Sequence, residues 1–194
     1  MNLKTLQNRI DKKKKSYPME WLGRSLAYTP YQPRELKDSF KKTQTFTPKQ
    51  IIKLLDDDFL NIAKSKEQVV SAFMLESLDN LAYIRRYTNI PLIYDFIIID
   101  EYQILESLVY GSDAIVLRAD ILNQKELKNL SDFALKLGLE RIFKINSKND
   151  LTKAIFAKSD ILLVENENLI ELIPNNKIII SSTINDNSID TNII

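Results

Sequence analysis

The amino-acid sequence predicts an α/β fold in which parallel strands and helices alternate around a (β/α) barrel. The clearest signal is a βαβ unit at residues 90–120. There an apolar run after Pro91 changes at Asp100 into a helix-period pattern, and a second apolar run follows Gly111. Such segments keep alternating from residue 44 onward. The strands are short and none precedes a Gly-x-Gly-x-x-Gly pattern, so a barrel is favoured over a doubly wound sheet.

The first 44 residues predict a helical extension. Leu3, Leu6 and Ile10 recur at helical spacing within residues 1–16, and Tyr17-Pro18 ends that helix. Short helical segments follow near residues 19–26 and 34–42. Thr47-Pro48 is typical of an N-cap followed by proline at the first helical position, so a helix through residue 55 is expected.

The remaining elements follow from periodicity and turn residues. Residues 59–63 are a weak strand candidate, and the apolar run 69–75 is expected to continue into a helix through residue 87. Helices are predicted at 124–137, 149–157 and 169–173, and strands at 141–145, 161–164 and 177–181. Residues 185–194 are polar with little pattern and are predicted to be a flexible tail, which leaves 45–184 for the barrel.

Composition excludes several classes of function. The 194-residue chain has a net charge of +1, so no bulk attraction to nucleic acid is expected; the basic run at residues 12–15 is interpreted as a solvated helix end, with a nucleic-acid patch as the lesser alternative. Cysteine and histidine are absent, which excludes disulfides and the commonest metal ligands, and no metal site is predicted.

Glycine and hydropathy add two further exclusions. The chain has three glycines, whereas phosphate-cradling loops usually need glycine for close backbone approach. This shortage argues against a nucleotide or sugar-phosphate site. No apolar run approaches the roughly 20 residues of a membrane span, and no signal segment is visible, so a cytoplasmic protein without a membrane span is expected.

Four motifs resemble one enzyme family. They are Leu-Gly-Arg-Ser-Leu-Ala at 22–27, Ile-Arg-Arg-Tyr-Thr-Asn-Ile-Pro at 84–91, Asp-Glu-Tyr-Gln-Ile-Leu-Glu-Ser-Leu-Val-Tyr-Gly-Ser-Asp-Ala at 100–114, and Leu-Gly-Leu-Glu at 137–140. Together they are similar to indole-3-glycerol phosphate synthase, over most of residues 3–184. The resemblance implies a TIM barrel with an N-terminal helical segment. It also implies an enzyme that closes and decarboxylates a phosphorylated anthranilate-deoxyribulose substrate without a cofactor.

The resemblance also locates the family's active site. The family's third strand carries a lysine that acts as general acid, and Asp95 stands there, or Tyr94 in a register shifted by one. Its fifth strand carries a glutamate that acts as base, and Lys144 stands there. Glu165 replaces an active-site asparagine and Ser181 a substrate-site glutamate, while Ser182 keeps its family identity as a phosphate-binding residue. An ionised carboxylate at Asp95 cannot donate the proton, so no catalytic residue is expected to be intact.

The family's first and eighth strands find no counterpart in the sequence. The first strand, Ile-Ala-Glu-(Val/Ile)-Lys, would contribute a glutamate and a lysine to the site. The sequence therefore predicts an incomplete TIM barrel that lacks both strands, with unpaired edges at 59–63 and 177–181. Open edges are templates for pairing with another chain, so a protein partner or self-association is expected.

The charged residues at the site positions leave several hypotheses open. Asp95, Arg118, Lys144 and Glu165 lie on four consecutive predicted strands. In the first hypothesis these residues are separate, solvated groups. In the second they form a rebuilt network in which Asp95 pairs with Arg118 and Glu165 with Lys144, and in the third they form a new small-ligand site. The leading functional hypothesis is a catalytically inactive synthase-like protein that acts as an interaction subunit. The alternatives are a lyase of tryptophan biosynthesis with weak or altered activity, and a decaying gene copy.

Overall fold

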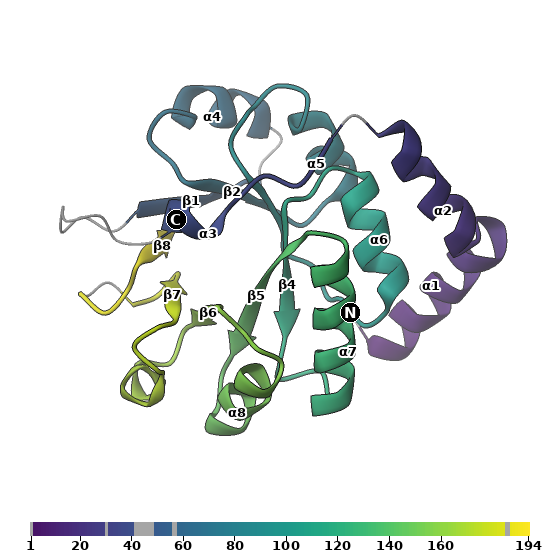
Figure 1. The fold of residues 1–194 in the computed structure, drawn as a ribbon. Helices are drawn as coiled ribbons and strands as arrows, with labels where there is room; N and C mark the ends of the chain where they lie inside the picture. Colours follow the sequence, from purple (N-terminus) through teal and green to yellow (C-terminus); the bar gives the residue numbers. More distant parts are fainter. Residues whose placement is uncertain (1, 30, 41–48, 56–57, 185–186) are drawn as a thin grey trace.

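The computed structural model describes residues 2–29, 31–40, 49–55, 58–184 and 187–194. In this part of the chain, eight parallel strands form a closed barrel in sequence order (Figure 1). The strands are β1 (Lys49–Lys53), β2 (Ala72–Leu75), β3 (Leu92–Tyr94), β4 (Ala114–Arg118), β5 (Glu140–Ile145), β6 (Ile161–Val164), β7 (Ile178–Ser181) and β8 (Thr191–Ile193).

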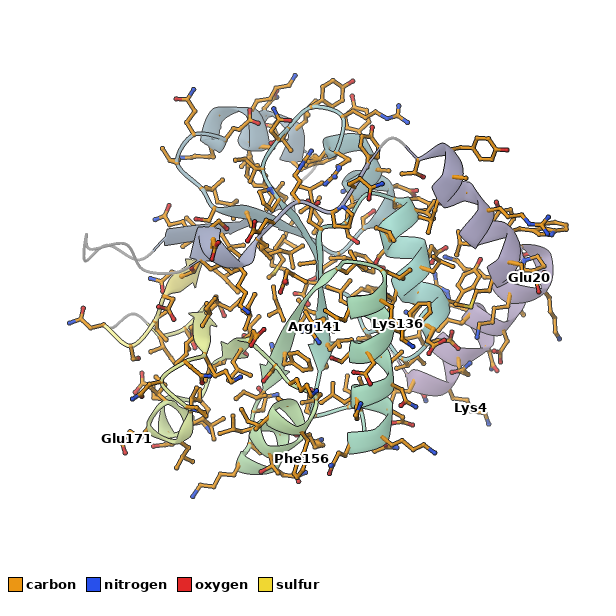
Figure 2. The ribbon with its side chains drawn as sticks, viewed as in Figure 1. Lys4, Glu20, Lys136, Arg141, Phe156 and Glu171 are labelled. Carbon is orange, nitrogen blue, oxygen red and sulfur yellow. The ribbon has the colours of Figure 1, made fainter. Side chains whose placement is uncertain are left out.

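Helices follow most of the strands and cover the outside of the barrel (Figure 1). They are α4 (Phe59–Lys66), α5 (Leu78–Ile84), α6 (Glu101–Val109), α7 (Gln124–Lys136), α8 (Lys148–Phe156) and the 3₁₀ helix η2 (Glu167–Leu172). Side-chain caps fix several of their starts: Asn123 and Glu126 form a reciprocal capping box on α7, and Asp100 accepts a hydrogen bond from the Tyr102 amide on α6. Exposed charged residues such as Glu20 and Glu171 lie at the periphery (Figure 2).

The prediction of an incomplete barrel is wrong, because β1 and β8 are both present and pair with each other. Lys49 is in register with Thr191, and Ile51 with Ile193. β8 also pairs with β7, so the predicted open edges do not exist in the described part of the chain. A protein partner or self-association was expected because of these open edges. Without them the partner remains a prediction.

The errors have a common physical cause, which is that short segments do not define a period. β1 has only two apolar residues, Ile51 and Ile52, and was predicted to be helical from Thr47-Pro48, which lies outside the described residues. The strand predicted at residues 59–63 belongs to α4, whose apolar residues suit either period. Residues 72–75 form β2, and β8 lies in the predicted flexible tail. Pairing with neighbouring strands, rather than local propensity, determines β1, β2 and β8.

The core has two layers that alternate along each strand. One set of buried side chains, including Ile51, Met74, Ile93, Val116 and Ile142, forms a cluster of its own inside the barrel. Their strand neighbours, such as Phe73 and Leu117, belong to a larger cluster shared with the helices. This alternation is the period of two that strands impose, with one face to the barrel interior and the other to the helices.

The N-terminal segment contributes to both the side and the floor of the barrel. Helices α1 (Leu3–Ser16) and α2 (Met19–Ser25), followed by the short 3₁₀ helix η1 (Leu26–Tyr28), pack against α6 through a cluster that includes Leu6, Leu22 and Tyr102. Lys13 and Lys14 of the basic run form ion pairs with Glu106 (2.7 Å) and Asp100 (2.5 Å). These two lysines therefore bind α1 to α6.

The floor of the barrel is closed by the short helix α3 (Lys37–Phe40). Leu36 and Phe40 are fully buried in the interior cluster, and the Thr191 hydroxyl donates to the Phe40 carbonyl over 3.2 Å. Lys37 pairs with Asp160, which precedes β6, at 2.6 Å. Access to the interior is therefore left to the opposite end. No helix in the described ranges is long and apolar enough to cross a membrane.

Candidate active site at the mouth of the barrel

The carboxyl ends of the eight strands meet at one end of the barrel, which we call the mouth. Inward-facing positions are apolar through the middle of the barrel, and the next inward position of most strands, two residues further on, is polar. These residues are Lys53, Glu76, Asp95, Arg118, Lys144, Glu165 and Ser182. The mouth is where (β/α)-barrel proteins carry their active sites.

On the side of strands β1 to β4, two cations flank one buried carboxylate. The Lys53 ammonium lies 2.7 Å from Glu76 Oε1 and 3.2 Å from Asp95 Oδ2. Arg118 Nη2 lies 3.7 Å from Asp95 Oδ1, and the Asp95 side chain is only 9% exposed. Two buried atoms here, Asp95 Oδ1 and Arg118 Nε, have no hydrogen-bond partner in the described part of the protein.

On the side of strands β5 to β7, a second cluster surrounds Glu165. The Lys144 ammonium lies 3.1 Å from this carboxylate, and the Ser182 hydroxyl donates to Glu165 Oε1 over 3.1 Å. Ser181, in contrast, is fully buried and accepts hydrogen bonds from the amides of Thr183 and Ile184. Ser181 therefore shapes the turn after β7, whereas Ser182 is exposed at the mouth.

Two groups at the mouth have displaced pKa values. Burial alone would lower the pKa of the Lys53 ammonium, but the hydrogen bond with Glu76 and the charge of Asp95 outweigh burial, so this pKa is raised. Burial would raise the pKa of the Glu165 carboxyl, but the hydrogen bond and charge of Lys144, with the Ser182 hydroxyl, lower it below its ordinary value. At neutral pH the first is an ammonium and the second a carboxylate.

The four charged residues that the sequence singled out thus stand in two pairs, Asp95 with Arg118 and Glu165 with Lys144. Sequence reasoning missed Lys53 and Glu76, because the segments that form β1 and β2 were both assigned to helices.

A signal for Lys53 does exist in the sequence. The first-strand pattern Ile-Ala-Glu-(Val/Ile)-Lys fits the observed strand Lys-Gln-Ile-Ile-Lys without a gap, which puts Lys53 at its lysine. Ile51 then stands where the pattern has glutamate, and it is buried inside the barrel. One site lysine is therefore retained, and one site carboxylate is replaced. No group of three or more acidic side chains in the described ranges comes together in a way that could hold a metal ion.

A closed barrel with ionisable residues at its mouth defines the class of (β/α)₈-barrel proteins. The family model of indole-3-glycerol phosphate synthase matches residues 71–186. The indole-3-glycerol phosphate synthase of Campylobacter jejuni strain 81-176 is 39% identical over an alignment 206 positions long, which covers 90% of this chain and 80% of the relative. The enzyme of Campylobacter concisus is 34% identical over an alignment 213 positions long, which covers 93% of this chain and 82% of the relative. The chain belongs to the indole-3-glycerol phosphate synthase family.

Solved structures with the same fold are more distant in sequence. One described as KGPDC from Streptococcus mutans superposes with a TM-score of 0.61 at 9% identity, over 76% of this chain and 87% of that one. The 3-keto-L-gulonate-6-phosphate decarboxylase of Vibrio cholerae gives a TM-score of 0.59 at 12% identity, over 77% and 87%. These similarities support the barrel fold alone.

The hypothesis of a catalytically inactive interaction subunit is wrong. It depended on the loss of two strands, and the barrel is complete. It also depended on the absence of any site lysine, and Lys53 is at the mouth. The relatives across about 90% of the chain are indole-3-glycerol phosphate synthases, and nothing indicates inactivity.

Proposed function

We propose that this chain is a lyase of the indole-3-glycerol phosphate synthase family with weak or altered activity, acting in tryptophan biosynthesis without a cofactor. Its substrate is the phosphorylated anthranilate-deoxyribulose compound that the family closes and decarboxylates. The observation that carries the proposal is the position of the Lys53 ammonium, 3.2 Å from Asp95, the residue at the place of the family's acid lysine.

Lys53 takes the role of proton donor in this proposal. The Lys53 ammonium extends from the end of β1 to the side chain of Asp95, which follows β3. A lysine nitrogen is therefore available at that part of the mouth. The raised pKa keeps Lys53 protonated at neutral pH, which makes the proton available. A raised pKa also makes the group a weaker acid, so ring closure is expected to be slower than with a donor whose pKa lies near neutrality.

Glu165 takes the role of base. In the family the base is a glutamate on the fifth strand, and here Lys144 occupies that strand while the carboxylate stands on β6, 3.1 Å away. An ammonium cannot accept a proton, whereas an ionised carboxylate can. Because the pKa of Glu165 is lowered, the carboxylate is present at neutral pH but is a weak base. Both displacements support an activity that is slow.

The test is a direct assay of the purified chain with the phosphorylated anthranilate-deoxyribulose substrate, followed by the indole absorbance and fluorescence of the product. We expect slow turnover by the wild type. Lys53→Met is expected to lower kcat by about 10²–10⁴-fold, the usual contribution of a positioned proton donor. Glu165→Gln is expected to reduce kcat in the same range.

Lys128→Met is the matched control, since Lys128 is a half-exposed lysine on α7 that pairs with Asp132 outside the mouth. It should retain wild-type turnover. No indole product from the wild type, or equal turnover by Lys53→Met and wild type, would contradict the proposal. Growth of a tryptophan auxotroph that expresses the chain provides the test in cells.

A further inference from the structure

Two buried polar atoms at the mouth are left over after the chain's own interactions are counted. Asp95 Oδ2 is held by the Lys53 ammonium, but Asp95 Oδ1 has no hydrogen-bond partner among the described residues, and neither has Arg118 Nε. The nearest approach between the two side chains, from Arg118 Nη2 to Asp95 Oδ1, is 3.7 Å, which is too long for a hydrogen bond. A buried polar group without a partner is costly, so each atom has capacity for a bond to a ligand.

The charges around these atoms limit what the ligand group can be. The described part of the mouth carries cations and carboxylates in equal number, namely Lys53, Arg118 and Lys144 with Glu76, Asp95 and Glu165. A phosphate or carboxylate placed between Asp95 and Arg118 would face the Asp95 carboxylate. An ammonium there would face Arg118 and Lys53. The two free atoms are one acceptor and one donor.

We propose that Asp95 and Arg118 together bind an uncharged hydroxyl group of the substrate. The hydroxyl donates its hydrogen to Asp95 Oδ1 and accepts from Arg118 Nε, so a single group satisfies both atoms without adding charge. The pair therefore determines specificity for substrates with a hydroxylated chain over β3 and β4. The identity of the substrate in this inference rests on the proposed function. The inference itself concerns binding of the substrate and not its turnover.

Arg118 is the better residue to change, because Asp95 keeps the Lys53 ammonium as a partner when Arg118 is removed. Arg118→Leu removes both the positive charge and the Nε donor. Arg118→Lys keeps the positive charge and removes the Nε donor. A hydroxyl bound by hydrogen bonding is lost in both variants, whereas general attraction of an anion would survive in the lysine variant.

The experiment measures dissociation constants through the fluorescence of the anthranilate group. The probes are the phosphorylated anthranilate-deoxyribulose substrate and analogues in which one chain hydroxyl at a time is replaced by hydrogen. The wild type is expected to bind the full substrate about 10- to 100-fold more tightly than one of the analogues, the usual value of a hydrogen bond to a charged group. Both Arg118 variants should lose this preference, and Lys128→Met should keep it.

The inference is overturned if the wild type binds all analogues equally well, if Arg118→Leu keeps the preference while still folded by thermal melting, or if Arg118→Lys keeps it. Turnover by the wild type without any hydroxyl preference would remove this inference and leave the proposed function standing. A hydroxyl preference without turnover would support it and remove the proposed function. No binding of any probe would overturn both.

Discussion

Two buried carboxylates at opposite ends of the barrel have very different surroundings. Asp113, at the floor before β4, is fully buried and accepts four hydrogen bonds, two from Arg85 Nη1 (2.6 Å each) and one each from the amides of Arg34 (2.6 Å) and Leu92 (2.7 Å). Asp95, at the mouth, accepts one within the described chain, from Lys53. The floor carboxylate is saturated by its own protein, and the mouth carboxylate is not.

The difference separates a structural end from a chemical end. At the floor, α3 fills the interior with Leu36 and Phe40, and the ion pairs tie the N-terminal segment to the barrel. At the mouth, the Arg118–Asp95 pair is separated by 3.7 Å, and the side chains of Arg118, Lys144 and Glu165 are partly exposed. This arrangement agrees with the general division of labour in such barrels, in which the amino ends of the strands serve stability and the carboxyl ends serve chemistry.

The strongest test of this comparison is Asp113→Asn. Removal of the charge leaves the Arg85 guanidinium buried without its counter-ion, which is expected to cost about 3–5 kcal/mol of unfolding free energy. Asp95→Asn is the matched variant at the mouth and should cost less, because Asp95 accepts one hydrogen bond in the described chain where Asp113 accepts four. Urea unfolding of both variants measures the difference. Equal losses would show that the two ends are not distinct in stability.

A second test at the floor is Gly111→Ala. Gly111 has φ +97°, and a Cβ there would lie 2.8 Å from Arg85 Cγ. Gly138→Ala is the control, since it has a similar positive φ of +78° but its nearest neighbour would be 3.8 Å away. Each change carries backbone strain of about 1–3 kcal/mol. Gly111→Ala should lose more unfolding free energy than its control, because it also displaces Arg85 from Asp113.

The smallest expected effect is the contribution of Glu165 to acid stability. Its pKa is lowered in the folded protein, so its ionised form stabilises the fold above its unfolded pKa of about 4.3, and that stability is lost as the pH falls through the folded pKa. The partly exposed pair with Lys144 is worth at most about 1 kcal/mol. Urea midpoints of wild type and Glu165→Gln should therefore differ slightly at pH 7 and converge as the pH falls through the folded pKa. A constant difference at all pH values would contradict this account.

The sequence was sufficient for the part of the barrel from β3 to β7. Residues 161–164 form β6 as predicted, and the βαβ unit appears as β3, α6 and β4. In this part, each strand or helix carries enough apolar residues, and clear enough caps, to define its period. The family resemblance was also correct.

β1, β2 and β8 were not predictable in the same way. β1 and β8 contribute few apolar residues and gain their stability from pairing with each other. The first strand also ends in a lysine that faces the mouth, so its pattern is interrupted where the site begins. The missed strand and the missed site residue are thus one error, since Lys53 becomes visible as a site residue only when β1 is recognised as a strand.

The seam between β1 and β8 has a consequence for how the protein becomes active. The Ile194 amide donates to the Ile51 carbonyl and the Lys53 amide to the Ile194 carbonyl, so these contacts join residues far apart in the sequence. Pairing of distant segments carries a large loop-closure entropy and tends to form late in folding. Lys53 sits on this seam. During synthesis the proposed proton donor is therefore expected to reach its position only after residues 191–194 have left the ribosome and paired with β1.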